Sequence, residues 1–79
     1  MSETVGPAVR EGGDEIVVNG EHRTIAPRTR LLDLLAELAL DPRAVAVERN
    51  GDVLRRAELP AVELAAGDRL EIVRFVQGG

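Results

Sequence analysis

Apolar and polar residues in the first half of the chain follow a pattern typical of a β-hairpin. The segment Glu15–Val18 is rich in β-branched residues, and a second strand-like segment, Glu21–Ile25, follows after two turn residues. These turn residues are Asn19 and Gly20, which both tolerate the positive φ that a tight hairpin turn requires. The pattern therefore predicts two antiparallel strands that are joined by an Asn-Gly turn.

A leucine repeat after this hairpin indicates one amphipathic helix. Pro27 should end the second strand, and Thr29 is expected to cap the helix, because its hydroxyl can accept from a free backbone N–H. Asp41-Pro42 should end the helix, since a residue before proline avoids the α region. The leucines that recur at helical spacing, down to Leu40, are Leu31, Leu34, Leu35 and Leu38.

The hairpin pattern occurs a second time after the helix. Ala44–Arg49 and Asp52–Leu54 are separated by another Asn-Gly pair, Asn50-Gly51. A short helical turn is expected over Arg56–Leu59, with a break at Pro60.

A last strand, Arg69–Val76, is expected after the turn residues Gly67-Asp68. The order β-β-α-β-β, closed by this strand, predicts an α+β fold in which one main helix crosses one face of a mixed sheet. The other face of the sheet should be more exposed to water. Residues 1–13 contain several glycines and few branched apolar groups, so they are expected to form a flexible extension, and residues 14–79 to form one domain.

Length and composition exclude several classes of protein. A chain of 79 residues forms one small core, which leaves little room for a deep catalytic pocket. The net charge is -4 and the ten basic residues, all arginine, are spread along the chain, so nucleic acid is not an expected partner. No apolar stretch could span a membrane and no secretory signal is visible, so we expect a soluble cytoplasmic protein.

The side chains that could carry chemistry are few. The chain has no Cys and a single His, so neither a nucleophilic Cys nor a clear Ser-His-Asp set is present, and we expect no enzyme activity. His22 is interpreted as a solvated strand residue and not as a metal ligand, and no metal site is expected. Arg55 and Arg56 are interpreted as a solvated pair, with contact to an acidic partner as the alternative.

The sequence Gln77-Gly78-Gly79 directly follows the apolar last strand. Glycine has no Cβ, so such a pair forms a thin strip that can enter a narrow slot in another protein. The alternative is a frayed end without a role, since small residues are common at termini. The tail favours a delivery function over catalysis.

From Ile16 to Gly79 the chain resembles the ThiS-type sulfur carriers of thiamine biosynthesis, small ubiquitin-like proteins with the β-grasp fold. Leucine stripes and Asn-Gly turns are common elsewhere, whereas an apolar strand that begins with Gly-Asp and runs directly into Gly-Gly is far more specific. The segments that carry the resemblance are Val17–Glu21, Leu31–Leu35, Val45–Gly51 and Gly67–Gly79.

This resemblance implies that the Gly79 carboxylate is the reactive group. A ThiF-type enzyme would adenylate it with ATP and Mg, and a donor such as a cysteine desulfurase would supply the sulfur of the resulting thiocarboxylate. A ThiG-type thiazole synthase would receive that sulfur, after Gln77 and Gly78 thread the tail into the active site. The chain would bind no cofactor of its own and would be a monomer when free.

The last strand is also the predicted docking surface for these partners. Its period places Leu70 and Ile72 on one face, so Val73 and Phe75 should be exposed on the other, with Val76 next to them. A bulge that turns Phe75 inward is the alternative, and it would also change the position of Arg74.

Three other functions fit the same sequence. A related sulfur carrier could serve molybdopterin synthesis, cysteine synthesis or tRNA thiolation. A ubiquitin-like modifier could attach its last glycine to another protein, although the absence of Lys means that it could not conjugate to its own side chains. A plain interaction module would not need the tail.

Overall fold

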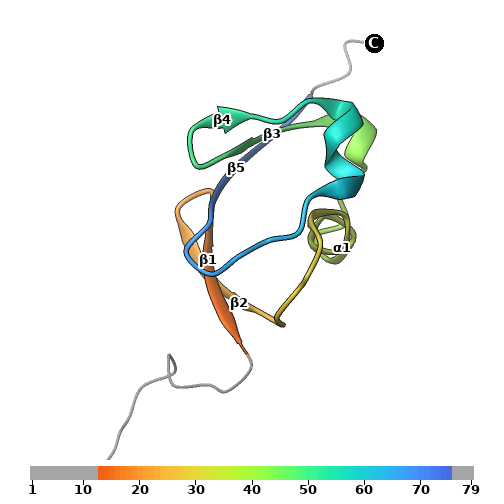
Figure 1. Ribbon diagram of the computed structural model, residues 1–79. Coiled ribbons are helices and arrows are strands. Elements are labelled where there is room, and N and C mark those ends of the chain that lie inside the picture. The colour runs from red at the N-terminus through yellow and green to blue at the C-terminus, as the bar shows by residue number, and fades with distance from the viewer. Residues whose placement is uncertain (1–12, 76–79) are drawn as a thin grey trace, which may run out of the picture.

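Two Asn-Gly hairpins provide four of the five strands of the sheet. The computed structural model describes residues 13–75, so the predicted extension lies outside the described residues except for Gly13. In the first hairpin, β1 (Asp14–Val18) pairs antiparallel with β2 (Glu21–Ile25) (Figure 1). Asn19 and Gly20 have φ values of 49° and 85°, as this tight turn requires. The first predicted hairpin is therefore confirmed.

The second hairpin is shorter than the sequence predicts. It consists of β3 (Val45–Arg49) and β4 (Asp52–Val53), joined by Asn50 and Gly51, whose φ values are 52° and 91°. The first strand was expected to begin at Ala44, but Ala44 closes the short 3-10 helix η2 (Pro42–Ala44) instead. The Asn-Gly pair determines the type of turn, whereas the residues at which the strands begin and end depend on the adjoining segments of the same chain.

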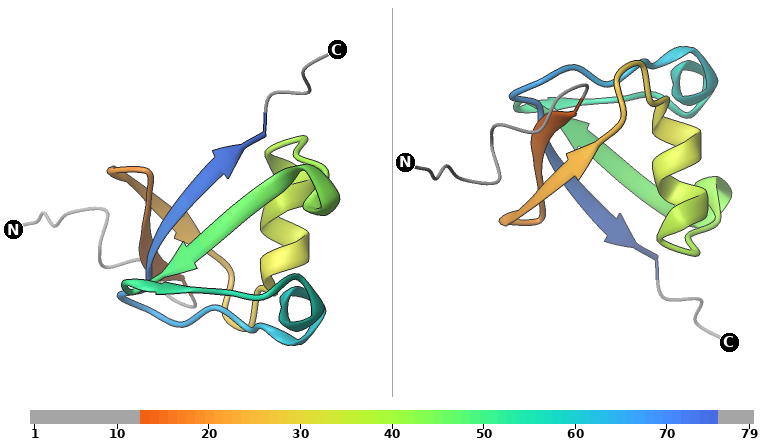
Figure 2. Two further views of the ribbon diagram at one scale, coloured as in Figure 1. Left: turned by 90° about the horizontal axis from the view of Figure 1, so that it is seen from above. Right: turned by 90° about the horizontal axis from the view of Figure 1, so that it is seen from below.

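The last strand, β5 (Arg69–Arg74), occupies the centre of the sheet. The strand order is β2-β1-β5-β3-β4, and β5 runs parallel to β1 and antiparallel to β3. The sheet is therefore mixed, as predicted. The two hairpins lie on either side of β5 and are connected to each other through it (Figure 2).

The helix α1 (Leu31–Glu37) covers one face of this sheet (Figure 2). The two-layer α+β architecture predicted from the element order is confirmed. Apolar side chains of the helix and the sheet form one buried core, and their burial contributes most of the free energy that stabilises so small a domain. The buried core consists of Ile16, Val18, Ile25, Leu31, Leu34, Leu35, Val45, Val47, Leu59, Val62, Leu64, Leu70 and Ile72.

The start of α1 corrects the predicted capping residue. Arg30, not Thr29, is the N-cap, and its backbone N–H donates to the Asp33 carboxylate at 3.3 Å. The Thr29 hydroxyl donates to the carbonyl of Ala26 at 2.6 Å and so stabilises the preceding turn. The segment around Glu63 crosses this end of the helix and forms a β-bridge with Arg30. That long-range contact sets the helix start, and the sequence pattern does not contain it.

The end of α1 also differs from the prediction, because the helix stops at Glu37 and does not continue to Leu40. Ala39 adopts a left-handed conformation with a φ of 61°. The N–H of Ala39 donates to Ala36 O at 3.0 Å and that of Leu40 to Leu35 O at 2.8 Å, which is the bonding pattern of a Schellman motif. Leu40 follows this reversal of the chain, and its side chain packs against the core.

A 3-10 helix, η3 (Arg56–Ala61), replaces the expected short turn and does not break at Pro60. The bond from Glu58 N–H to Arg55 O closes its first turn, and the bond from Val62 N–H to Leu59 O closes its last. Pro60 lies inside the last turn, and neither bond requires an N–H group at the proline. Leu59 is the buried residue of this element.

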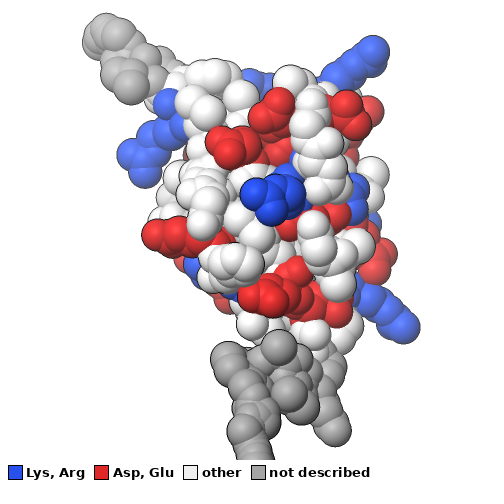
Figure 3. Space-filling view, turned by 90° about the vertical axis from the view of Figure 1, so that its left-hand side faces the viewer, with Lys and Arg blue, Asp and Glu red and all other residues white. Residues whose placement is uncertain are grey.

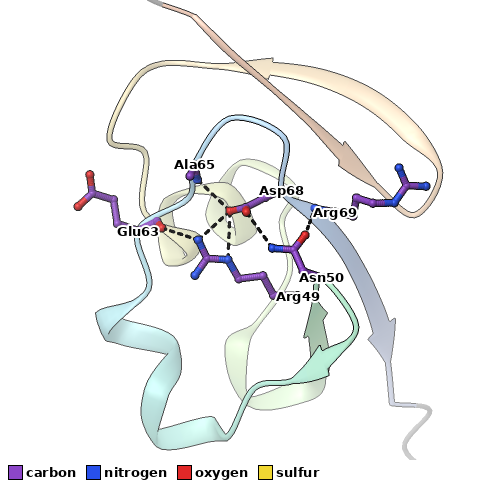
Figure 4. A network of polar contacts seen from close by, with 6 residues as sticks. All are labelled: Arg49, Asn50, Glu63, Ala65, Asp68 and Arg69. Atoms are coloured by element: carbon purple, nitrogen blue, oxygen red, sulfur yellow. Dashed lines mark hydrogen bonds and ion pairs between the residues drawn. The ribbon is translucent and has the colours of Figure 1, made fainter.

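A buried carboxylate fastens the loop before β5 to the second hairpin (Figure 4). The side chain of Asp68 is 7% exposed and accepts from Arg49 Nη2 at 2.9 Å and from Asn50 Nδ2 at 3.0 Å. The N–H of Ala65 donates to the same carboxylate at 2.8 Å, and the Oδ1 of Asn50 accepts from Arg69 N–H at 2.9 Å. The last strand is therefore positioned by polar contacts as well as by the core.

Candidate functional site

The residues expected to carry the chemistry follow directly after β5. Phe75 is the last residue that the structure describes, so Val76, Gln77, Gly78 and Gly79 lie outside the described residues. Their predicted roles in docking, threading and sulfur attachment stay predictions. What the structure does describe is the surface from which this tail departs.

Two exposed apolar side chains lie on the outer face of β5 and at the residue directly after it. Val73 is 57% exposed and Phe75 is 44% exposed, whereas Leu70 and Ile72 are buried in the core. The N–H of Phe75 donates to the carbonyl of Ala44 at 2.9 Å, which continues the regular antiparallel register between β5 and β3. The alternative in which a bulge turns Phe75 inward is therefore wrong.

A shallow apolar groove lies beside Val73 on the same face. It has a volume of about 230 Å³, and the sequence analysis missed one of its most exposed members, Val53, which is 72% exposed. The signal was present, because a hairpin pairs Val53 with Glu48 on a face that the helix does not cover. The lining residues are Ala46, Val47, Glu48, Val53, Glu71 and Val73.

Charged groups are interspersed with uncharged ones across this outer face (Figure 3). Glu48 and Glu71 border the groove, and neither forms an ion pair with a basic group in the described part of the chain. We define Val53, Val73, Phe75, Glu48 and Glu71 as the outer patch. An apolar centre with unpaired carboxylates matches a partner surface that is apolar with basic groups at its margin.

A second concave surface lies between the first hairpin and the end of α1. This cleft has a volume of about 350 Å³ and its polar lining includes His22 and Arg23. His22 is solvated, as predicted, and its Nδ1 lies 3.0 Å from the Glu15 carboxylate. The apolar part of the lining comes from Val18, Leu38 and Leu40.

Among residues 13–75, Asp68 is the one buried carboxylate, and its contacts are structural. Burial alone would raise the pKa of Asp68, but hydrogen bonds from Ala65 N–H, from the Asn50 amide and from Arg49 outweigh it, so the pKa lies below its ordinary value. Asp68 is therefore a charged group whose two oxygens already accept hydrogen bonds from neighbouring donors. It is not suited to act as a general acid or base near neutral pH.

No helix within residues 13–75 is both long enough and apolar enough to cross a membrane. The described residues also contain no cluster of three or more side chains that could hold a metal ion.

Comparison with known proteins places the chain beside small carriers and beside larger enzymes. The model of the ThiS family matches residues 16–79. A sulfur carrier protein ThiS from Thermus thermophilus is 36% identical over 62 residues, which are 78% of this chain and 95% of that protein. A thiazole synthase from Paramagnetospirillum magneticum is 42% identical over 65 residues, which are 82% of this chain. This chain spans only 20% of the length of that synthase.

A solved structure supports the same grouping. The crystal structure of the thiamine biosynthesis protein ThiS from Geobacter metallireducens superposes with a TM-score of 0.70 at 34% sequence identity. The match covers 82% of this chain and 99% of that one. The β-grasp fold expected from the sequence is therefore confirmed.

Proposed function

The chain belongs to the ThiS family, and we propose that it is a sulfur carrier in thiamine biosynthesis, not a catalyst. The observation that carries this proposal is the family match over residues 16–79, because it continues through the fold to Gly79. In this role the Gly79 carboxylate is the only group of the chain that changes covalently.

The proposed chemistry has two balanced steps. A Gly79 carboxylate oxygen attacks the α-phosphorus of ATP in a partner enzyme, which forms an acyl-adenylate and releases pyrophosphate. A hydrosulfide equivalent then attacks the acyl carbon, and AMP leaves with the carboxylate oxygen, which yields a thiocarboxylate. Activation is needed because negative charge and resonance protect a free carboxylate from nucleophiles. ATP and Mg belong to the partner, a ThiF-type enzyme. Where a cysteine desulfurase supplies the sulfur, the terminal sulfur of its persulfide attacks the acyl carbon in place of hydrosulfide and AMP leaves. A thiol then reduces the resulting acyl disulfide to the thiocarboxylate and is itself oxidised to a disulfide.

A ThiG-type thiazole synthase is the proposed acceptor of the sulfur. Two thiazole synthases each contain a region 42% identical to this chain, and the matched chain accounts for 20% of their length. A carrier-like segment within the same polypeptide as the synthase favours a direct functional connection between the two.

The outer patch is the proposed docking surface for the activating enzyme. Val73 and Phe75 are exposed directly before the tail. An enzyme that binds this face would therefore have Gly79 within reach of its active site. Four extended residues span about 13 Å, at roughly 3.3 Å each, which allows the carboxylate to enter an active site well away from the sheet.

The test is the intact mass of the full chain after incubation with its candidate adenylating enzyme, ATP and sulfide. We expect the mass to increase by the difference between sulfur and oxygen, and fragmentation should locate the change at Gly79. A variant that lacks Gly79 is the matched control and should remain unmodified. An unchanged mass, under conditions in which a known ThiS protein is converted, would contradict the proposal.

A further inference from the structure

The backbone of β5 directs alternate residues toward its two neighbours. Asn50 N–H donates to Arg69 O at 2.8 Å, and Phe75 N–H donates to Ala44 O at 2.9 Å, so the odd-numbered residues of β5 bond toward β3. The even-numbered residues consequently bond toward the opposite edge, on the side of β1. These residues are Leu70, Ile72 and Arg74.

The strand β1 supplies backbone partners to only the first of these three residues. Asn19 N–H donates to Leu70 O at 2.8 Å, and the chain then turns away at Gly20. The side chain of Asn19 supplies the next pair of bonds: its Oδ1 accepts from Ile72 N–H at 2.7 Å and its Nδ2 donates to Ile72 O at 3.1 Å. One carboxamide therefore takes the place of a strand residue.

Arg74 is the next residue of β5 whose backbone faces this edge, and the hydrogen-bonded pairing on the β1 side ends before it. Within residues 13–75, no group forms a hydrogen bond with the backbone N–H or carbonyl of Arg74 on the β1 side. The carboxyl-terminal half of β5 extends past the first hairpin, and no strand among the described residues lies beside it on that side (Figure 2). A strand edge with a free donor and a free acceptor is a template for pairing with another chain.

The surroundings of this edge suit an added strand. Asn19 also lines the cleft of about 350 Å³ that includes Leu38 and Leu40, so the cleft adjoins the edge. Side chains of a strand alternate between its two faces, so a strand laid beside Arg74 would direct every second side chain toward the cleft side of the sheet. An apolar side chain there would contact the two leucines.

We propose that an extended strand of the enzyme that processes the C-terminus pairs with β5 at Arg74 and so continues the sheet into the partner. This inference rests on the proposed function. Gly79 is the fifth residue after Arg74, which is a reach of about 16 Å for an extended chain. Backbone bonds at Arg74 would fix the direction in which these residues enter the active site, and side-chain contacts on the outer patch alone would not.

The test combines amide hydrogen exchange with a proline variant, using the full-length chain and its candidate adenylating enzyme. In the free protein the Arg74 amide should exchange rapidly, whereas the Val73 amide, which bonds toward β3, should be protected. Saturating enzyme should slow exchange at Arg74 by at least about tenfold, as expected for one new hydrogen bond. Unchanged exchange at Arg74 in the complex would overturn the proposal.

The substitution Arg74→Pro removes the N–H group that the proposal requires. The β3 ladder does not use that N–H, so the variant should fold. Arg74→Ala is the matched control, because it removes the side chain and keeps the N–H. We expect Arg74→Pro to bind the enzyme at least about tenfold more weakly than Arg74→Ala. Equal binding by the two variants would overturn the proposal, and if the proline variant does not fold, exchange in the wild-type chain decides.

The two proposals fail in different ways. Protection at Arg74 without sulfur at Gly79 would keep the strand pairing and remove the carrier function. Sulfur at Gly79 with an unprotected Arg74 would keep the carrier function and remove the strand pairing.

Discussion

Glu48 and Glu71 lie directly opposite each other on β3 and β5, on the face of the sheet opposite to that of the buried Val47 and Ile72. They occupy a hydrogen-bonded pair of the ladder, and no basic group among residues 13–75 forms an ion pair with either carboxylate. Like charges in directly opposite positions destabilise a sheet. An arrangement that costs stability within the domain is consistent with a partner that supplies the missing positive charge.

The substitution Glu71→Lys should therefore separate stability from binding. It replaces repulsion across the strands with attraction, so we expect the free energy of unfolding in urea to rise by about 0.5–1 kcal/mol. The same change should weaken association with the activating enzyme, measured by titration calorimetry. Glu63→Lys, at an exposed side chain outside the outer patch, is the control and should bind normally. If Glu71→Lys binds the enzyme as tightly as the wild-type chain does, the two carboxylates are not part of the docking surface.

Asp68→Asn should be one of the most destabilising single changes in this chain. It keeps the shape of the side chain but removes the negative charge that faces Arg49, and one oxygen that accepts from its neighbours becomes an NH₂ donor. We expect a loss of about 2–4 kcal/mol in the free energy of unfolding, measured by urea denaturation. Asp52→Asn, at an exposed carboxylate of the second hairpin, should change stability very little.

The lowered pKa of Asp68 predicts a loss of stability in acid. A carboxyl group whose pKa is lower in the folded state stabilises the fold above its unfolded pKa, at about pH 4, and loses this contribution as the pH falls through the folded pKa. The difference in unfolding free energy between wild type and Asp68→Asn should be constant from pH 7 to about pH 5 and should shrink below about pH 4. A difference that stays constant down to pH 2 would contradict this assignment.

Ala39→Gly should stabilise the domain. Ala39 holds a φ of 61° at the end of α1, a conformation that glycine adopts without the steric cost of a Cβ. We expect the free energy of unfolding to rise by about 0.5–1 kcal/mol and the midpoint of thermal unfolding to rise by about 2–8 °C. Ala36→Gly, within the helix, is the control and should destabilise by about 1 kcal/mol. A lower midpoint for the Ala39 variant would contradict the prediction.

Gly79→Val should leave folding intact and abolish activation. The added β-branched side chain would be sensed only by the narrow slot of the enzyme that admits the tail. Pyrophosphate release in the presence of ATP measures the adenylation step directly, and thermal unfolding verifies the fold. Thr24→Val, at an exposed position of β2, is the control for an added valine and should be adenylated at the normal rate. Normal adenylation of the Gly79 variant would eliminate a steric role for the terminal glycine.

The elements could be predicted because their signals are local. Asn19-Gly20 and Asn50-Gly51 require positive φ, and that requirement is satisfied within four residues in each case. The exposure of Val73 and Phe75 followed from the period of one strand. Local chemistry was therefore sufficient for the architecture and for the outer face of β5.

The remaining features depend on residues that are far apart in the sequence. The N-cap at Arg30 is set by a bridge to Glu63, and Asn19 bonds to Ile72 over a separation of 53 residues. Propensity and period carry no information about such pairings, so these parts of the site emerge only from the three-dimensional arrangement.

The central position of β5 has a consequence for synthesis on the ribosome. The two hairpins that flank it can form from short stretches of chain, but they remain unconnected until residues 69–74 have emerged. Folding is therefore completed by the strand that precedes Gly79, the residue at which we propose that sulfur is attached. An enzyme that needs both the sheet and the tail can act only on chains that have finished folding, so the same strand would serve as a form of quality control before sulfur is loaded.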